Sequence, residues 1–153
     1  MDTPPPRSRQ QRSDDTLRRL GNDVDVWVAT ADPSTGTPYL VPLSFMWDGT
    51  HVLVSTLAAS PTSRNLRDGG KARLGFGPTR DLVLMDAVLE EAVPTAEMPD
   101  ELADAFATRA GFDPREQDED YLYFRIRPNR IQAWREANEL AGRDLMRDGA
   151  WLT

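Results

Sequence analysis

Apolar and polar residues alternate along most of the chain, which predicts short antiparallel strands. Valines occupy every second position from Val24 to Val28, while Trp27 and Ala29 fall on the opposite face of the same strand. The Asp48-Gly49 pair predicts a tight hairpin. Further strands are predicted over 37–47, 51–56, 71–76, 81–93, 121–126 and 130–134, the last two separated by Pro128-Asn129. Six or seven such strands predict a mainly β fold that closes into a small barrel, because closure removes exposed strand edges.

Helical signals are confined to a few stretches. Ser13 is a suitable N-cap for a short helix that stops at Gly21, and Pro99 and Gly111 mark the limits of a second helix over 100–110. The last stretch, 138–153, is expected to form a weak helix or turns. Residues 1–12 include three consecutive prolines and almost nothing that can be buried, which predicts a disordered N-terminal tail. Residues 13–153 then form one domain.

The composition limits the chemistry that the side chains can perform. The 153 residues include one histidine, His51, and no cysteine. Thiolate nucleophiles, disulfides, cysteine zinc sites and two-histidine metal sites are thereby excluded, and a haem would have only one candidate imidazole ligand. The acidic stretch 113–120 matches no ligand spacing and is interpreted as a solvated connector. We expect no metal site, and we identify no general acid or base, so redox activity would require a bound cofactor.

The charge balance narrows the partners. The formal net charge is −7, and Lys71 is the only lysine, so every other basic residue is an arginine. An acidic chain of this kind argues against nucleic-acid binding, which normally leaves a basic footprint. No apolar run approaches the roughly 18–20 residues of a membrane span, and the N-terminus lacks the features of a signal peptide. We therefore expect a cytoplasmic protein that acts on a small molecule.

The stretch 55–67 carries the clearest binding signal. Ser60 followed by Pro61 is typical of a helix start, and Gly69-Gly70 supplies a stop, so a short helix begins directly after a strand. Free N–H groups of its first turn would lie at the positive end of the helix, a position suited to a phosphate. Arg64 and Arg67 in the next turn could add bidentate contacts. The same pattern also occurs in helices that only connect strands.

Several motifs, taken in order, resemble one known family. They are Thr37–Gly49 with its Trp-Asp-Gly hairpin, Ser55-Thr56 at a strand end, Ser60–Leu66, Gly77–Asp81, and Gln132-Ala133-Trp134. Each motif is weakly specific, but their order and spacing are similar to the pyridoxamine 5'-phosphate oxidase-like split-barrel family over about residues 13–153. The resemblance implies a six-stranded antiparallel split β-barrel of the FMN-binding type. It also implies a homodimer with two flavin or deazaflavin sites at the interface.

The resemblance further implies which residues hold the cofactor. The phosphate site of the family maps to Ser60, Thr62, Arg64 and Asn65, with Ser55 and Thr56 at the preceding strand end. The strand along the flavin ring maps to Val41, Pro42, Leu43 and Ser44, and Trp134 maps to an aromatic residue that approaches the ring of the partner's cofactor.

Two departures from the family pattern bear on the substrate. The strand Leu40–Ser44 contains no basic residue, and Pro61 and Thr62 stand where the oxidases carry an Arg-Lys pair. We therefore expect a substrate other than pyridoxamine phosphate, with Arg64 or Arg67 supplying the charge of the cofactor site.

Three functions remain open from the sequence. The leading hypothesis is an FMN-binding oxidoreductase. A reductase that uses the deazaflavin coenzyme F-420 is the alternative, and its acidic tail would require clustered arginines such as Arg64, Arg67, Arg127 and Arg130. A binding protein that keeps the barrel without any cofactor is the third.

Overall fold

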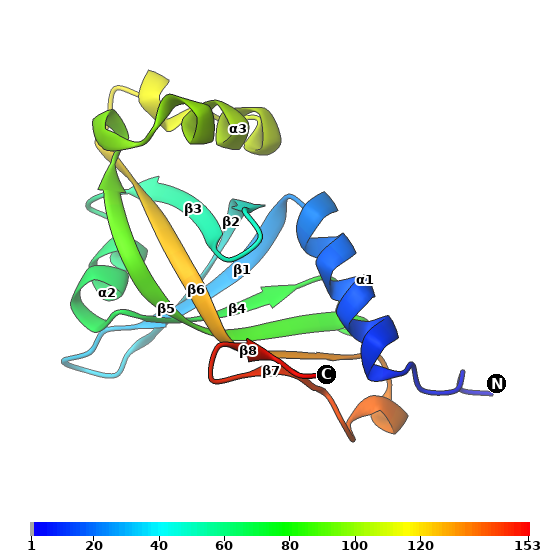
Figure 1. Cartoon of the computed structure of the whole chain (residues 1–153). Helices are drawn as coiled ribbons and strands as arrows, with labels where there is room; N and C mark the ends of the chain where they lie inside the picture. Colours follow the sequence, from blue (N-terminus) through cyan, green and yellow to red (C-terminus); the bar gives the residue numbers. More distant parts are fainter. Residues whose placement is uncertain (1) are drawn as a thin grey trace.

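Eight strands form one antiparallel sheet in the computed structural model of the chain, which describes residues 2–153 (Figure 1). Six of them close into a barrel in the order β3-β2-β1-β4-β5-β6, because β6 also pairs with β3. This confirms the mainly β, six-stranded antiparallel barrel expected from the sequence. The barrel strands are β1 (Asp25–Ala31), β2 (Pro38–Trp47), β3 (Val52–Leu57), β4 (Lys71–Phe76), β5 (Leu82–Pro94) and β6 (Tyr121–Trp134).

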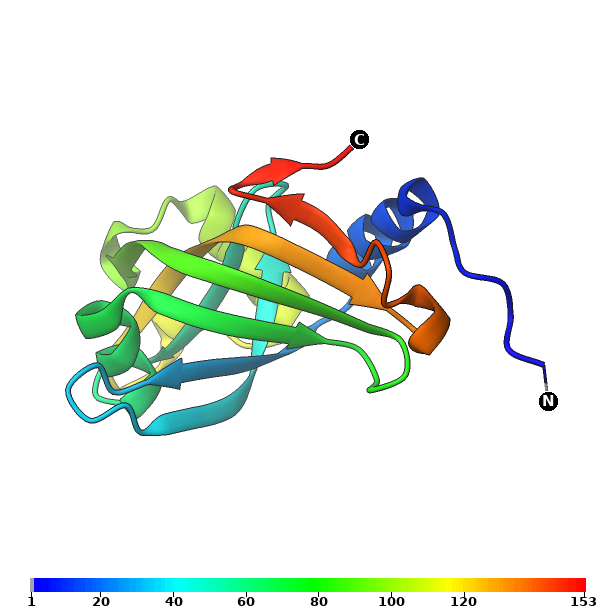
Figure 2. The same ribbon diagram turned by 90° about the horizontal axis from the view of Figure 1, so that it is seen from below.

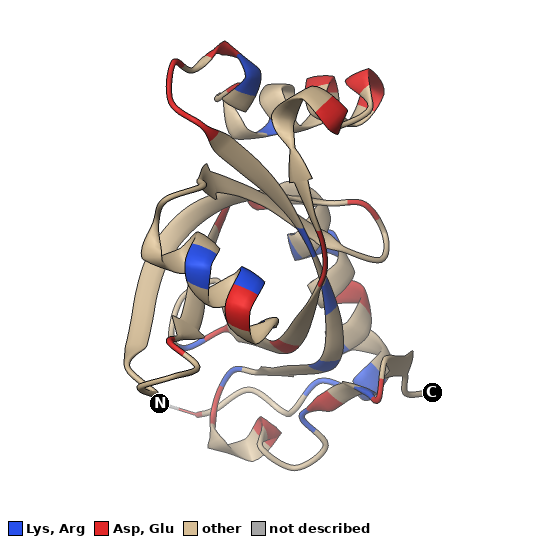
Figure 3. Ribbon diagram, turned by 90° about the vertical axis from the view of Figure 1, so that its left-hand side faces the viewer, with Lys and Arg blue, Asp and Glu red and all other residues tan. Residues whose placement is uncertain are grey.

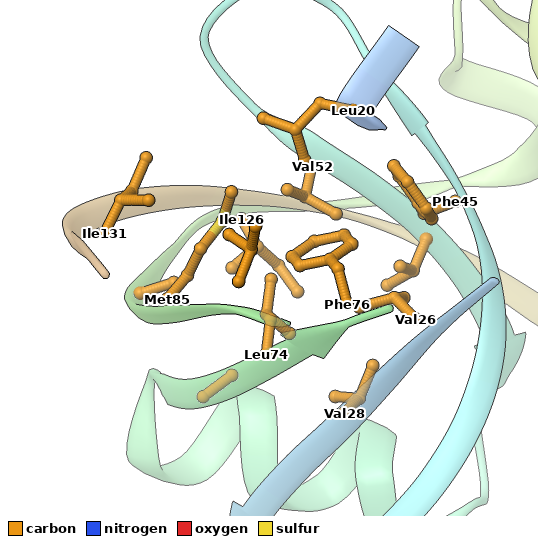
Figure 4. Close-up of a cluster of buried hydrophobic side chains, with 14 of the residues drawn as sticks. Leu20, Val26, Val28, Phe45, Val52, Leu74, Phe76, Met85, Ile126 and Ile131 are labelled. Carbon is orange, nitrogen blue, oxygen red and sulfur yellow. The ribbon is translucent and has the colours of Figure 1, made fainter. Parts of the chain in front are cut away.

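The barrel interior is filled by the residues that alternate inward along the strands (Figure 4). Val26 and Val28 of β1 point into it, and Phe45 meets Phe76 edge to face with ring centroids 5.0 Å apart. Burial of side chains of this size contributes about 1.5–3 kcal/mol each. Because a one-residue slip would turn every inward side chain outward, this core fixes the strand register.

Three α-helices cover the barrel within residues 2–153: α1 (Arg9–Asn22), α2 (Pro61–Gly69) and α3 (Asp100–Ala110). Helix α2 lies across one end of the barrel, the end that faces the viewer in Figure 3, and inserts the fully buried Leu66 into the core. Helix α3 covers a second, smaller core in which Phe106 packs edge to face on Tyr123. Short 3-10 turns occur at Thr95–Glu97, Pro114–Glu116 and Ala137–Glu139. Among the described residues, no helix is both long enough and apolar enough to cross a membrane.

The first helix begins at Arg9, earlier than the predicted start at Ser13. Ser8 is its N-cap, and Ser8 and Gln11 exchange side-chain and backbone hydrogen bonds in a capping box. The helix is strongly polar, so its sequence carries little of the apolar periodicity from which helices are recognised.

Two arginines just before and inside this helix are tied to the C-terminal part of the chain. Arg7 donates three hydrogen bonds to the carboxylate of Glu139, and the buried Arg12 donates to the carbonyls of Ala133, Glu139 and Ala141. The prediction of a disordered tail over 1–12 is therefore wrong for residues 7–12. Met1 lies outside the described residues.

The C-terminal third differs from the prediction in two places. Strand β6 runs without interruption through Pro128, which sits at a register shift against β5 where the ladder between Asp86 and Ala87 is irregular. A bulge tolerates proline because the ladder requires no N–H there. The stretch expected to form a weak helix or turns instead contains the hairpin β7 (Asp144–Arg147) and β8 (Ala150–Trp151).

Candidate functional site

The start of α2 combines a capped helix with one backbone donor left over. The Ser60 hydroxyl accepts a hydrogen bond from the Ser63 amide at 3.1 Å, and the Ser60 amide donates to Leu57. Pro61 at the first helical position has no N–H. The amide of Thr62 is therefore the donor of the first turn that remains for a ligand, at the positive end of the helix dipole.

Two arginines add positive charge beside this helix start. The guanidinium of Arg64 donates to the carbonyl of Ala59, and that of Arg67 donates to the carbonyls of Ala58 and Ser63. Neither arginine forms an ion pair with a carboxylate anywhere in the described chain, and both side chains are exposed. Their charge is thus available to an anion at the helix start.

The polar side chains of α2 differ in whether they have a hydrogen-bond partner in the barrel. Ser63 donates to the carbonyl of Leu57 at 2.5 Å, and the Asn65 amide donates to the hydroxyl of Thr30 on β1 at 3.1 Å. Both are buried and fasten α2 to the barrel, so Asn65 does not face a ligand. The hydroxyl of Thr62 is also buried but has no hydrogen-bond partner among residues 2–153.

An unsatisfied buried hydroxyl costs about 1–3 kcal/mol. Together with the free amide of Thr62 and the two guanidinium groups without carboxylate partners, this hydroxyl makes the donor set of the helix start suitable for the phosphate of a flavin nucleotide. The chemistry of the residues present therefore fits the cofactor that the sequence resemblance implies.

The end of β3 contributes less than the sequence suggests. The Ser55 hydroxyl donates to the carbonyl of Leu122 at 2.9 Å, across the pairing of β3 with β6. Thr56 is half-buried at the point where β3 leads toward α2, and its hydroxyl stays available. Of these two predicted residues, Ser55 serves the closure of the barrel.

The predicted ring-binding strand has two different faces. Val41 and Leu43 pack against the core, whereas Pro42 lies opposite Trp27 and Ser44 opposite Asp25 on the outward face. All four residues pair with β1 on one side only, because β3 pairs with β2 only over 45–47. The other backbone edge of this part of β2 is therefore unpaired, and its amide and carbonyl groups can bind a planar heterocycle.

An apolar groove of about 500 Å³ lies on the outer face of the barrel. Figure 2 views this face, where β6, β5, β4, β1 and β2 lie side by side. Trp27 and Leu40 in the groove are 51% and 58% exposed, and Leu84 and Trp134 also line it. The sequence does not identify Trp27 or Leu40 as site residues, although the alternation in β1 places Trp27 on the face opposite the core valines.

The predicted site residues therefore fall into two groups within one chain. Ser60, Thr62 and Arg64 lie at the end of the barrel covered by α2, whereas Trp134 ends β6 near the opposite end (Figure 1). Trp134 does not reach the helix start of its own chain.

The arginines that a deazaflavin tail would require are not gathered in one groove. Arg127 on β6 lies 3.8 Å from Glu90, and Arg130 on the same strand binds Asp144 at 3.1 Å. Arg64 and Arg67 are on α2 instead, so the expected cluster is divided between two elements and half of its charge is neutralised.

The lone histidine lies in the hairpin between β2 and β3, away from both the start of α2 and Trp134. His51 is buried, its Nδ1 lies 3.3 Å from Asp48, and its Nε2 contacts Glu90. Burial alone would raise the pKa of Asp48, but the backbone hydrogen bonds from His51 and Thr50 outweigh it and lower the pKa. His51 therefore stabilises the start of β3, at the far end of that strand from α2.

Comparison with known proteins agrees with this architecture. A family model described as pyridoxamine 5'-phosphate oxidase matches residues 21–135. A sequence search of curated proteins finds no significant match. Among solved structures, a protein named F420 reductase is 18% identical, with 74% of this chain and 93% of that chain covered and a TM-score of 0.62.

Two further structures are similar over most of their length. An FAD-binding protein from Mesorhizobium loti is 18% identical, with 78% of this chain and 89% of that chain covered and a TM-score of 0.60. A Clostridium acetobutylicum protein of the pyridoxine phosphate oxidase family is 15% identical, with 85% and 92% covered and a TM-score of 0.60. At these identities the likeness establishes the shared fold.

Proposed function

The chain belongs to the pyridoxamine 5'-phosphate oxidase family, and on that basis we propose that it is an oxidoreductase that binds FMN. The observation that carries the proposal is the start of α2, where a free amide and an unsatisfied hydroxyl on Thr62 lie in the first turn ahead of two arginines without carboxylate partners. This is the donor set that a phosphate monoester requires.

The residues of the chain then have distinct tasks. Thr62 donates to the phosphate, and Arg64 and Arg67 exchange their carbonyl partners on Ala58 and Ala59 for phosphate oxygens. The unpaired edge of β2 over 41–44 holds the ring through backbone groups. When bound, the flavin supplies the hydride or electron transfer, which the side chains themselves cannot perform.

We further propose that the substrate is not pyridoxamine phosphate. The outward residues of β2 beside the site are neutral: Leu40, Pro42 and Ser44. A phosphorylated substrate would require cations at this position, and the strand offers none. A neutral or apolar substrate fits the exposed side chains of this face better.

The outer face supports a homodimer with the cofactor sites at its interface. The exposed Trp27 and Leu40 and the half-buried Trp134 form an apolar surface around the groove, and exposed patches of this kind mark interaction sites. A second copy on this face would bring its Trp134 toward the cofactor bound by the first chain. This explains why Trp134 and the helix start lie apart within one chain.

Cofactor binding is tested on the purified protein. We expect flavin absorbance, release of FMN on denaturation, and a cofactor affinity that falls roughly 10–100-fold in the double variant Arg64→Ala/Arg67→Ala. Arg18→Ala, which removes a 65% exposed arginine from α1, is the matched control and should leave the affinity unchanged. Colourless protein that binds no FMN would refute the proposal and favour the cofactor-free binding protein.

The dimer is tested by sedimentation velocity. The wild-type chain should sediment as a dimer of the 17.1 kDa protomer, and Trp27→Glu should convert it to a monomer. A wild-type monomer at micromolar concentration would contradict the interface.

The deazaflavin coenzyme F-420 is the second candidate cofactor, because the protein named F420 reductase shares the fold. The divided and partly neutralised arginines described above favour FMN. Titration of the purified apoprotein with each cofactor separates the two, since tighter binding of the deazaflavin would overturn the choice of FMN.

A further inference from the structure

A cationic pocket separate from the start of α2 is formed by the end of β6, the chain before β7, β7 itself and the start of α1. Its volume is about 240 Å³, and its lining includes four arginines: Arg9, Arg130, Arg143 and Arg147. Asp144 is the one carboxylate among the lining residues. In a chain with a formal net charge of −7, this pocket concentrates positive charge.

Asp144 neutralises only part of this charge. It accepts hydrogen bonds from Arg130 at 3.1 Å, from Arg147 at 3.0 Å and from Gln132 at 2.8 Å. Burial alone would raise the pKa of Asp144, but these hydrogen bonds outweigh it and lower the pKa. The carboxylate therefore stays ionised and holds two of the four guanidinium groups in place around the pocket.

The other two arginines bind main-chain oxygens. Arg9 donates to a main-chain oxygen of Thr153, the last residue of the sequence, at 3.2 Å, and Arg143 donates to the carbonyl of Leu140 at 3.4 Å. The guanidinium carbon of Arg143 also lies 5.6 Å from the centroid of the Trp134 ring. Arg143 forms no ion pair within residues 2–153. Contact with the indole orients the Arg143 side chain, so less conformational entropy is lost when it binds a ligand.

We propose that this pocket binds a small polyanion, a molecule with at least two phosphate or carboxylate groups. Four planar guanidinium groups around one cavity match such groups through paired N–H···O hydrogen bonds. A single monovalent anion would leave much of the excess charge uncompensated. The site is separate from the start of α2, and its occupancy does not depend on whether FMN binds there.

Isothermal titration calorimetry at constant ionic strength tests the proposal, with pyrophosphate and citrate as separate probes. At least one should bind saturably at one site per chain with a dissociation constant below about 1 mM, and the preferred probe identifies phosphate or carboxylate as the ligand chemistry. Arg143→Gln and Arg147→Gln should each weaken binding roughly 10–100-fold. Arg18→Gln changes the net charge equally on an exposed part of α1 and should leave binding unchanged.

Three results would overturn the proposal. The first is the absence of saturable binding of either probe to the wild-type protein. The second is equal weakening by Arg18→Gln and the pocket variants, which would indicate diffuse attraction by surface charge. The third comes from a variant at the cofactor site. The variant Arg64→Gln separates this site from the cofactor site: loss of anion binding there, with retention in Arg143→Gln, would assign the anion to α2 and refute the second pocket. Thermal unfolding of each variant verifies that it is folded.

Discussion

The contact between Arg7 and Glu139 should contribute measurably to stability, although the sequence places Arg7 in a tail. The carboxylate of Glu139 accepts hydrogen bonds from the Arg7 amide and guanidinium and from the Arg135 amide, and the side chain is 3% exposed. Hydrogen bonding by Arg7 outweighs burial and lowers the pKa of Glu139 from 4.5 to about 2. By thermodynamic linkage, this difference corresponds to a contribution of about 3 kcal/mol at neutral pH.

The substitution Glu139→Gln removes the charge with little change in shape. We expect a loss of about 3 kcal/mol in the free energy of unfolding at pH 7, equivalent to a melting temperature roughly 6–12 °C lower for a chain of this size. Between its folded and unfolded pKa values Glu139 binds fewer protons in the folded state. The contribution is therefore complete above about pH 5 and declines as the pH falls toward 2, with less than roughly half remaining at pH 3.

Urea unfolding followed by circular dichroism at pH 7 and pH 3 measures this difference between variant and wild type. Glu101→Gln, on an exposed position of α3, is the matched control and should change stability little at either pH. A loss for Glu139→Gln that is as small as the control's, or that is the same at both pH values, would refute the docking of residues 7–12 by this carboxylate.

Three further predictions concern stability and are measured by chemical or thermal unfolding. Asn65→Ala should cost about 1–3 kcal/mol because it leaves the Thr30 hydroxyl without its donor; no loss would mean that the hydrogen bond is not formed. Gly77→Ala should cost about 1–3 kcal/mol, because Gly77 has a φ of +78° and an added Cβ would lie 2.7 Å from the carbonyl oxygen of Asp81. Tyr123→Phe should be neutral or stabilising, because the buried hydroxyl has no partner in the described part of the chain; a loss above about 1 kcal/mol would reveal one.

Local signals in the sequence are sufficient to predict most of the strands and turns of the barrel. The Asp48-Gly49 hairpin forms as predicted, and the Asp48 carboxylate accepts hydrogen bonds from the backbone amides of Thr50 and His51. Helix α2 lies between Ser60 and Gly70, as its caps predict. These elements depend on residues close together in the chain, so their chemistry is visible in the sequence.

The errors arose where distant residues decide the structure. The sequence predicts a disordered tail at Arg7 because the partner that orders it, Glu139, is 132 positions away. It predicts a strand break at Pro128 because the bulge that accommodates this proline depends on pairing with β5. The β7–β8 hairpin is different: Asp148-Gly149 is a second Asp-Gly turn signal, with positive φ at both residues, and it could have been recognised.

In the candidate site, too, the features that depend on nearby residues are predictable from the sequence and those that depend on distant residues are not. The cap at Ser60 and the charges on α2 were readable from spacing, whereas the hydrogen bond that commits Asn65 to Thr30 was not, because that partner lies on β1. The arginine pocket is not predictable from the sequence either, since its arginines come from three separate parts of the chain.

The pairing of β3 with β6 has a consequence for how the chain folds. It joins residues such as Ser55 and Leu122 that are 67 positions apart, whereas the other distant pairings, β1 with β4 and β5 with β6, join partners that are closer in sequence, such as Trp27 with Gly75 and Leu82 with Trp134. Closing so long a loop carries a large entropic cost before any contact compensates it, so this seam should form late and slowly. Until it forms, β3 and the first half of β6 expose hydrogen-bonding edges, and self-association during refolding should increase with protein concentration.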